Sequence, residues 1–203
     1  MNAPVAPSLD TSATGPSSPR ASPTRISWKR WFLPAAIITL VGDQISKWWV
    51  FSLPATTVFP DWIYRAENTG TAWSMFRDQP QLVTLLTLFL IPGLTWLWWA
   101  RYRQAGAATN LSFGLILGGA VGNGIDRVAA RLASTGPGAS GASGAFGTHG
   151  VRDFIHVDLG FWPAHPWPDF NLADSGITIG FLVLVALSFT SPPPTSAARP
   201  VRP

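Results

Sequence analysis

Four long apolar segments alternate with polar ones along this chain. Each is close to the roughly 20 residues that an α-helix needs to cross the hydrocarbon core of a bilayer. The pattern therefore predicts four membrane-spanning helices, at residues 31–51, 81–100, 111–128 and 173–189. Small residues in the third segment would let its backbone approach neighbouring helices closely; they are Gly114, Gly118, Gly119, Ala120 and Gly122.

The polar segments differ in composition. Residues 1–27 and 191–203 are rich in Pro, Ser, Thr and Ala and contain no apolar run. They cannot bury enough surface to offset the entropy of ordering, so we predict disordered tails. Residues 52–80 combine short alternating stretches with Pro and Gly, which indicates a small segment outside the membrane with some strand character. The Gly/Ser/Ala-rich residues 132–149 are typical of a flexible insertion, within a membrane domain at residues 28–190.

Composition and charge support a membrane location and give it an orientation. Only 12% of the residues are charged, about half of the roughly 25% found in soluble domains. The basic residues form small groups at 20–30, 101–103 and 199–202 rather than one stripe, which argues against nucleic-acid binding. With four spans these groups share one side, and the positive-inside rule makes that side cytoplasmic. We therefore expect an all-α, multi-pass membrane protein with four transmembrane helices, both termini inside the cell and a small extracytoplasmic segment that contains β-structure.

Ionisable and amide side chains concentrate near the expected outer ends of the spans. Such groups are costly in a membrane and by default functional. The set comprises Asp43, Lys47, Asn123, Asp126, Arg127, Asp153, Asn171 and Asp174. Asp43 and Lys47 are four residues apart and can pair on one helix face, with Lys47 extending toward the interface. The absence of cysteine excludes thiol catalysis, disulfides and thiolate metal ligands.

Three of these aspartates are candidates for a catalytic pair. Two carboxyl groups brought within a few ångströms cannot both ionise easily, so one keeps a proton and acts as an acid while the other acts as a base toward water. Arg127 and Asn123 are ready partners for Asp126 and would hold it charged in a structural role. Asp153 and Asp174 have no basic neighbour in their own helical turn, and Arg152 should point away from Asp153 if that segment is extended. We therefore choose Asp153 and Asp174.

Five short motifs resemble the sequence boxes of the bacterial type II signal peptidases, also called lipoprotein signal peptidases. They are DQxSK at 43–47, NxGxAWS at 68–74, GNxxDR at 122–127, VxDF at 151–154 and FNxAD at 170–174. The resemblance covers roughly residues 35–190. One departure is the stretch from Asp126 to Asp153, which the Gly/Ser/Ala-rich insertion makes much longer than is usual in the family.

The resemblance implies a function. Members of the family are intramembrane aspartic endopeptidases of the inner membrane, so the chain would remove the signal peptide from diacylglyceryl-modified prolipoproteins by cutting just before the lipidated cysteine. It implies Asp153 and Asp174 as the catalytic pair, an extracytoplasmic active site, and neither a metal nor another cofactor. The expected partners are the prolipoproteins and membrane lipid, with the chain acting as a monomer. Supporting or substrate-binding roles would fall to Asp43, Lys47, Asn68, Gly70, Asn123, Asp126, Arg127 and Asn171.

Other functions fit the sequence less well. A proton-coupled transporter or channel would carry binding groups toward the membrane midplane, but the inner halves of all four spans lack acidic residues. A membrane scaffold would explain the small residues of the third span and not the carboxylates. A metalloprotease would need ligands at a recognisable spacing, which His149, His156 and His165 do not provide. We expect these to be loop and interface histidines.

Overall fold

The computed structural model of the protein describes residues 28–54, 56–70, 75–76, 78–135, 150–162 and 165–190. Within them the chain forms four α-helices, α1 (Trp28–Ser52), α2 (Pro80–Leu97), α3 (Ala107–Thr135) and α4 (Leu172–Thr190). A π-helical turn, η2 (Trp98–Tyr102), follows α2, and the strands are β1 (Ile63–Asn68), β2 (Val151–Val157) and β3 (Trp167–Phe170). The predicted tails at 1–27 and 191–203 and most of the predicted insertion lie outside the described residues.

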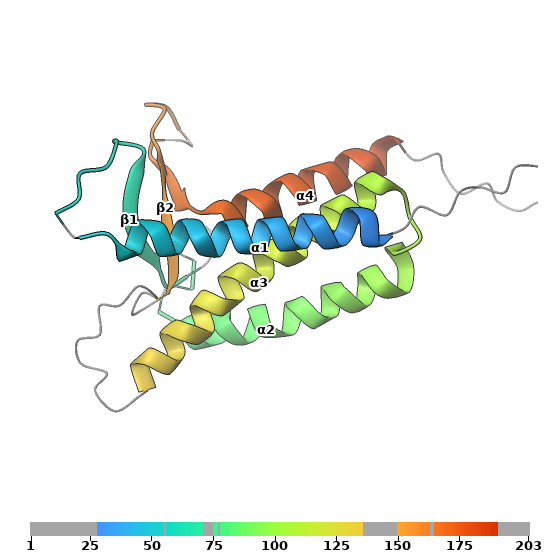
Figure 1. Ribbon diagram of the computed structural model, residues 1–203, viewed down its shortest axis with the longest axis horizontal. Helices are drawn as coiled ribbons and strands as arrows, with labels where there is room; N and C mark the ends of the chain where they lie inside the picture. Colours follow the sequence, from blue (N-terminus) through green and yellow to red (C-terminus); the bar gives the residue numbers. More distant parts are fainter. Residues whose placement is uncertain are drawn as a thin grey trace, which may run out of the picture.

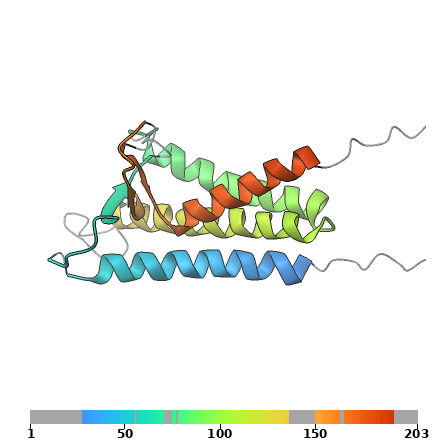
Figure 2. The same cartoon turned by 90° about the horizontal axis from the view of Figure 1, so that it is seen from above.

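The helices run side by side, and the sheet lies across one end of the bundle (Figure 1). Figure 2 shows that the described chain begins, at Trp28, and ends, at Thr190, at the opposite end, where α2 also turns into α3. We call these two ends the sheet end and the terminal end. The third helix, α3, contacts α1, α2 and α4 and forms the centre of the bundle.

Glycines allow α3 to lie close to its neighbours. A Cβ atom built on Gly118 would lie 2.5 Å from the carbonyl oxygen of Ala36 in α1, and Gly114 and Gly119 are similarly crowded against α1 and α4. Backbones at this separation leave no room for a side chain, which is why small residues occur at such contacts. The close approach predicted from the small residues of the third span is confirmed.

The bundle carries many of its large apolar side chains on the outside. Ile38 of α1, Phe89 of α2 and Phe181 of α4 are 70%, 83% and 58% exposed, and apolar surface on this scale marks contact with a membrane or a partner. By length and composition, two described segments qualify as membrane spans, Pro80–Tyr102 and Leu172–Thr190. The other two helices, α1 and α3, are also long but bury polar side chains.

The four helices lie where the four spans are predicted, but their boundaries differ, and the crossing of the membrane by all four stays a prediction. α1 begins at Trp28 rather than at residue 31, and α3 continues past residue 128 to Thr135, into the residues predicted to form a flexible insertion. An apolar pattern marks the part of a helix that is buried or lipid-facing and not the end of its backbone hydrogen bonds, so polar turns at either end escape it.

The sheet has the order β1-β2-β3, with antiparallel neighbours. The strand character predicted for residues 52–80 is confirmed in β1. The sequence pattern does not predict β3, because WPDF is short and contains Pro, a residue confined to sheet edges and strand starts. In β2, Asp153 pairs with Ala66 and Arg152 with Glu67. These consecutive side chains of β2 therefore point to opposite faces of the sheet.

Candidate active site

A cluster of buried polar side chains fills the sheet end of the bundle, where α1 and α3 meet β2 and the start of α4. Its most buried members are each at most 5% exposed: Asp43, Lys47, Asn123, Asp126, Arg152, Asp153 and Asn171. Asp174 and Arg127 adjoin this set and are half-buried. Charges buried this deeply are costly unless they are paired and hydrogen-bonded, so the partners of each group decide what the cluster can do.

Lys47 lies at the centre of the cluster. Its Nζ atom is 2.8 Å from Asp43 Oδ2 and 3.1 Å from Asp126 Oδ2, and it donates to Asn123 Oδ1 at 3.0 Å. The predicted pair between Asp43 and Lys47 is confirmed. The prediction that Lys47 extends to the interface is wrong, because three acceptors from two helices surround its ammonium group and the side chain is fully buried.

Asp126 is held by Arg152 and not, as predicted, by Arg127. Arg152 Nη2 lies 2.6 Å from Asp126 Oδ1, and the Arg152 backbone N–H donates to Asp126 Oδ2 at 3.0 Å. Consecutive residues on a helix do not face each other, so Arg127 points away from its neighbour, whereas β2 brings Arg152 to it. Arg152 also points away from Asp153, as predicted. The structural role of Asp126 stays a prediction, now with Lys47 and Arg152 as its cations.

Gln44 and Arg152 belong to the cluster although the sequence did not single them out as site residues. Gln44 Nε2 donates to Asp43 Oδ2 at 3.0 Å, and Gln44 Oε1 accepts from Arg152 Nη2 at 3.2 Å. The signal for Gln44 was its place inside the DQxSK motif. The signal for Arg152 was the strand alternation that turns it away from Asp153, although alternation alone does not say what lies on the other face.

Carboxylate and amide side chains fix the start of α4. Asn171 Oδ1 accepts from the Asp174 N–H at 2.9 Å, and Asp174 Oδ2 accepts from the Asn171 N–H at 3.2 Å, the reciprocal arrangement of a capping box. Asp43 Oδ1 accepts from the Ala173 N–H at 3.0 Å. Gly122 leaves room for this carboxylate, because a Cβ atom there would lie 2.6 Å from Asp43 Oδ2. Negative charge is favourable at a helix N-terminus, so the fold of α4 itself positions Asp174.

Two asparagines connect Asp153 and Asp174. Asn171 Nδ2 donates to Asp153 Oδ1 at 2.7 Å, and Asn123 Nδ2 donates to Asp174 Oδ1 at 2.7 Å. The asparagines also contact each other, with Asn171 Nδ2 at 3.2 Å from Asn123 Oδ1. Asn123 therefore binds Asp174 and not Asp126, its predicted partner. The structure joins the two aspartates chosen from the sequence in one hydrogen-bonded network.

The surroundings of Asp153 favour its neutral form. Burial raises the pKa of Asp153, and the charge of Asp174 raises it further. Hydrogen bonds from Asn68 and Asn171 lower it, and the resulting pKa is about 8. In the described part of the chain, the ion pairs of the cluster join other groups, namely Lys47 and Arg152 to Asp43 and Asp126. At neutral pH Asp153 therefore holds a proton beside a second carboxyl group.

Arg127, Asn68 and Gly70 border the two aspartates. Arg127 Nη2 lies 3.4 Å from the Gly70 carbonyl oxygen, and the Gly70 N–H donates to Asn68 Oδ1 at 3.0 Å. The guanidinium of Arg127 interacts most strongly with the charge of Asp174 and next with that of Asp153. Its Nε atom is buried and has no hydrogen-bond partner within the residues that the structure describes. One buried donor is thus placed close to both aspartates.

The raised pKa of Asp153 predicts how stability changes with pH. The ordinary pKa of an aspartate, which applies to the unfolded chain, is 3.8, and the pKa of Asp153 in the folded protein is about 8. Between these values the folded state binds more protons, so stability falls as pH rises. Asp153→Asn removes this dependence. We expect the melting temperature of the variant to exceed that of the wild type by a margin that grows from pH 5 to pH 9, measured by thermal unfolding in detergent. A constant margin would contradict the raised pKa.

The histidines have local partners. His156 Nδ1 lies 2.7 Å from Asp169 Oδ1, and His165 Nδ1 lies 2.8 Å from Asp158 Oδ1. Over the described ranges, no group of three His, Cys, Asp or Glu side chains is arranged to hold a metal ion. His149 lies outside the described residues.

Comparisons with a family model and with curated proteins point to the same family. A family model described as signal peptidase II matches residues 35–190. A lipoprotein signal peptidase of Chlorobium phaeobacteroides is 34% identical over 181 residues, covering 83% of this chain and 96% of the relative. One of Beijerinckia indica, with the same name, is 37% identical and covers 77% of this chain and 86% of its own length.

Two solved structures share the fold. Both are described as bacterial membrane enzymes determined by the in meso method, at 2.3 and 1.9 Å resolution. They superpose on this chain with TM-scores of 0.59 and 0.58 and are each 22% identical to it. The matches cover 85% and 80% of this chain and nearly all of each solved chain. At this level of identity the likeness is one of fold.

Proposed function

The chain belongs to the signal peptidase II family, and on that premise we propose that it is an intramembrane aspartic endopeptidase with Asp153 and Asp174 as its catalytic pair. Family membership makes it a peptidase of lipoprotein processing, which removes signal peptides from prolipoproteins. Its substrates would be diacylglyceryl-modified prolipoproteins, cut just before the lipidated cysteine.

One observation carries the catalytic proposal. Asp153 is only 2% exposed, its pKa of about 8 keeps it protonated at neutral pH, and the Asn171 side chain that binds it also contacts the Asn123 side chain that binds Asp174. A protonated and an ionised carboxyl group in one network can act as acid and base in the same reaction. Asp43 and Asp126 are instead held in ion pairs, by Lys47 and Arg152 respectively.

In the proposed reaction, the carboxylate of Asp174 takes a proton from water while the water oxygen attacks the carbonyl carbon of the scissile peptide bond. The proton of Asp153 moves to the carbonyl oxygen and gives a neutral tetrahedral diol. Asp174 then returns its proton to the amide nitrogen, and Asp153 recovers one from a diol hydroxyl as the carbon–nitrogen bond breaks. The products are a carboxylic acid and a free amine, and both aspartates end in their starting states.

Hydrogen-bond donors beside the two aspartates are suited to binding the peptide substrate. Arg127 and Asn68 border the two aspartates, and the buried Nε of Arg127 lacks a partner in the described residues. We assign both side chains to the binding of substrate carbonyl oxygens, whose developing charge such donors stabilise. Gly70 anchors both of them through its N–H and its carbonyl oxygen.

The arrangement supports the predicted orientation in the membrane. At the terminal end α1 begins and η2 leads into α3 (Figures 1 and 2). These segments carry Lys29, Arg30, Arg101 and Arg103, whereas the cluster of buried polar side chains lies at the sheet end. The positive-inside rule then places the terminal end in the cytoplasm and the proposed active site outside. The enzyme would act from the outer face of the inner membrane, with all four helices crossing it.

Reporter fusions test this topology. We expect a reporter fused after Arg103 to indicate a cytoplasmic location, because the terminal end carries the basic residues. A reporter inserted at Gly141 should indicate an extracytoplasmic location. Paired reporters that work on opposite sides of the membrane give the measurement and control for expression. An external signal at Arg103 or an internal one at Gly141 would contradict four spans with both termini inside.

A cleavage assay tests the proposed substrate. Purified protein in detergent is incubated with a prolipoprotein that carries the diacylglyceryl group, and the released signal peptide is followed by mass spectrometry. The same prolipoprotein without the lipid is the control. We expect cleavage immediately before the modified cysteine and little or none in the control. Equal cleavage of both forms would remove the lipid requirement, and no cleavage under conditions where a related enzyme works would remove the proposal.

A further inference from the structure

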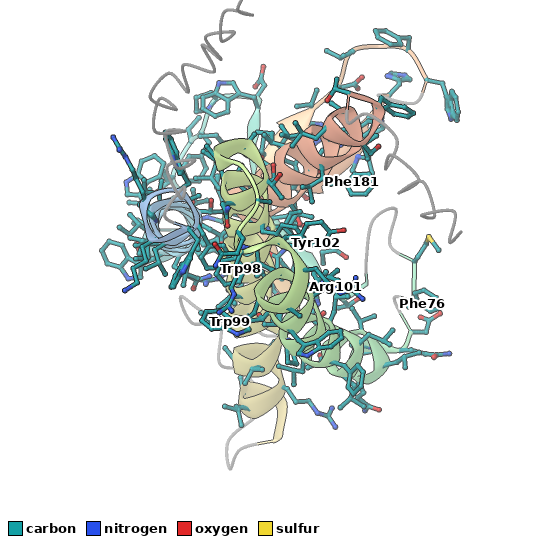
Figure 3. All side chains as sticks on the ribbon, turned by 90° about the vertical axis from the view of Figure 1, so that its right-hand side faces the viewer. Phe76, Trp98, Trp99, Arg101, Tyr102 and Phe181 are labelled. Atoms are coloured by element: carbon teal, nitrogen blue, oxygen red, sulfur yellow. The ribbon has the colours of Figure 1, made fainter. Side chains whose placement is uncertain are left out.

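An aromatic cluster joins α1 to η2 at the terminal end, away from the proposed active site. The rings of Phe32 and Trp98 are stacked with centroids 3.7 Å apart, and Trp28 packs edge-on against Trp98 at 5.5 Å and Trp99 at 5.9 Å. Figure 3 views the molecule from this end and labels Trp98 and Trp99 on the π-helical turn. Membrane proteins place tryptophan at the level of the lipid headgroups, where one side of the ring is apolar and the other wet.

The π-helical turn is held in place by its own hydrogen bonds. Trp98 Nε1 donates to Asn110 Oδ1 at 2.9 Å, and Asn110 Nδ2 donates to the Ala105 carbonyl oxygen at 2.9 Å. The Arg103 N–H donates to the Trp98 carbonyl oxygen at 2.8 Å and closes the wide turn. Such turns are rare and are found frequently at functional sites. Here the turn brings two consecutive tryptophans against α1.

An apolar groove begins beneath this cluster. It has a volume of about 220 Å³ and lies between α1, α2 and α3. Phe32 belongs both to the aromatic cluster and to the lining, which continues through Ala36, Leu40, Thr95, Leu117 and Val121. The groove can take a length of acyl chain, whereas a helix, with a diameter of about 10 Å including side chains, does not fit.

Two basic side chains lie over rings of the aromatic cluster, at the end of the groove that carries it. Arg103 Cζ lies 4.3 Å from the centroid of the Trp99 ring, and Lys29 Nζ lies 5.7 Å from that of Trp28. The helical segments around them are free of carboxylates, because residues 28–42 and 79–125 contain neither Asp nor Glu. The groove therefore ends at a positively charged surface, and no carboxylate from these described helical segments offsets its charge.

We propose that this groove binds an anionic phospholipid of the cytoplasmic leaflet, with an acyl chain along α1 and α2 and the phosphate beside Lys29 and Arg103. Basic pockets between transmembrane helices on the cytoplasmic side are suited to acidic headgroups, and the lack of Asp and Glu in residues 28–42 and 79–125 favours an anionic over a zwitterionic lipid. The inference goes beyond peptide cleavage and rests on the proposed orientation of the chain.

Native mass spectrometry of the delipidated protein tests the proposal. The protein is mixed with equal concentrations of dioleoylphosphatidylglycerol and dioleoylphosphatidylcholine, and retained lipid is counted. We expect one phosphatidylglycerol to be retained in preference to phosphatidylcholine. Arg103→Gln should weaken its retention about fivefold, the effect of one basic residue near an anionic surface. Arg131→Gln, at the far end of α3, removes the same charge outside the groove and should have no effect.

A second variant tests the groove without changing charge. Thr95 lines it, and Thr95→Phe would fill it from the exposed face of α2. We expect this variant to lose phosphatidylglycerol, while Thr84→Phe, three turns earlier on the same helix, retains it. Equal retention of both lipids by the wild type, or unchanged retention by Arg103→Gln and Thr95→Phe, would overturn the proposal. Retained lipid binding with impaired prolipoprotein cleavage in Thr95→Phe would also overturn it and assign the groove to the peptide substrate.

Discussion

Asp153→Asn and Asp174→Asn are each expected to lower prolipoprotein cleavage by about 10³-fold or more while leaving the protein folded and inserted in the membrane. General acid–base catalysis alone contributes about 10²–10⁴-fold, and an amide keeps the volume of the carboxyl group but can neither hold nor take the proton that the two aspartates share. Asn171 and Asn123 bind these two carboxyl groups, so both changes fall inside the same hydrogen-bonded network.

Rates are measured on purified variants and normalised to folded protein, with thermal unfolding as the check on folding. Asp158→Asn is the matched control, because Asp158 follows β2, pairs with His165 and is exposed, outside the buried cluster. It should cleave at the wild-type rate. Full activity in Asp153→Asn beside an inert but well-folded Asp126→Asn would move the catalytic pair to Asp126 and Asp174.

The helical part of the fold could be predicted from sequence because lipid imposes a simple rule on it. A chain that crosses a bilayer must satisfy its backbone hydrogen bonds internally, and four apolar segments therefore predict four helices. The rule is silent where the chain leaves the apolar layer. It does not predict the turns of α3 that extend to Thr135 or the short strand β3, and the π-helical turn at Trp98–Tyr102 differs from a helix by a hydrogen-bond shift that no apolar period reveals.

The sequence predicts which residues gather at the candidate site better than it predicts which of them pair with each other. Asp153 and Asp174, the pair chosen from the sequence, lie in one hydrogen-bonded network, and their catalytic role stays a prediction. Adjacency in sequence predicts Arg127 as the partner of Asp126, yet the partner is Arg152, which comes from another element. Neighbours along a helix are visible in a sequence, whereas the contact between α3 and β2 depends on how the sheet packs against the bundle.

Lys47 is a second residue whose partners the sequence does not reveal, and these partners decide whether its charge can be buried. A lone lysine near a membrane edge reaches water, and one partner four residues away does not change that. The structure gives it Asp126 and Asn123 from α3 in addition to Asp43. A buried ammonium group is tolerated once several acceptors surround it, and two of the three acceptors of Lys47 come from α3, a helix that lies far away in the sequence.

Because its partners are buried cations, Asp126→Asn is expected to be the most destabilising single change in the cluster. Asp126 accepts from Arg152 through both its guanidinium and its backbone N–H, and it also contacts Lys47. Removing one partner of a buried ion pair costs about 3–5 kcal/mol, since it leaves an uncompensated charge. An asparagine would in addition turn an N–H₂ donor toward groups that are themselves donors. Thermal unfolding in detergent and membrane expression level measure the effect.

The control and a second variant separate charge from packing. Asp169→Asn removes a half-buried carboxylate that pairs with His156 in the sheet, and it should change the melting temperature far less. Combining Asp126→Asn with Arg152→Gln removes one of the stranded cations, so the double variant should be more stable than the sum of the two single losses predicts. A melting temperature for Asp126→Asn equal to the wild type, or strictly additive losses, would show that the pair between α3 and β2 does not hold the cluster together.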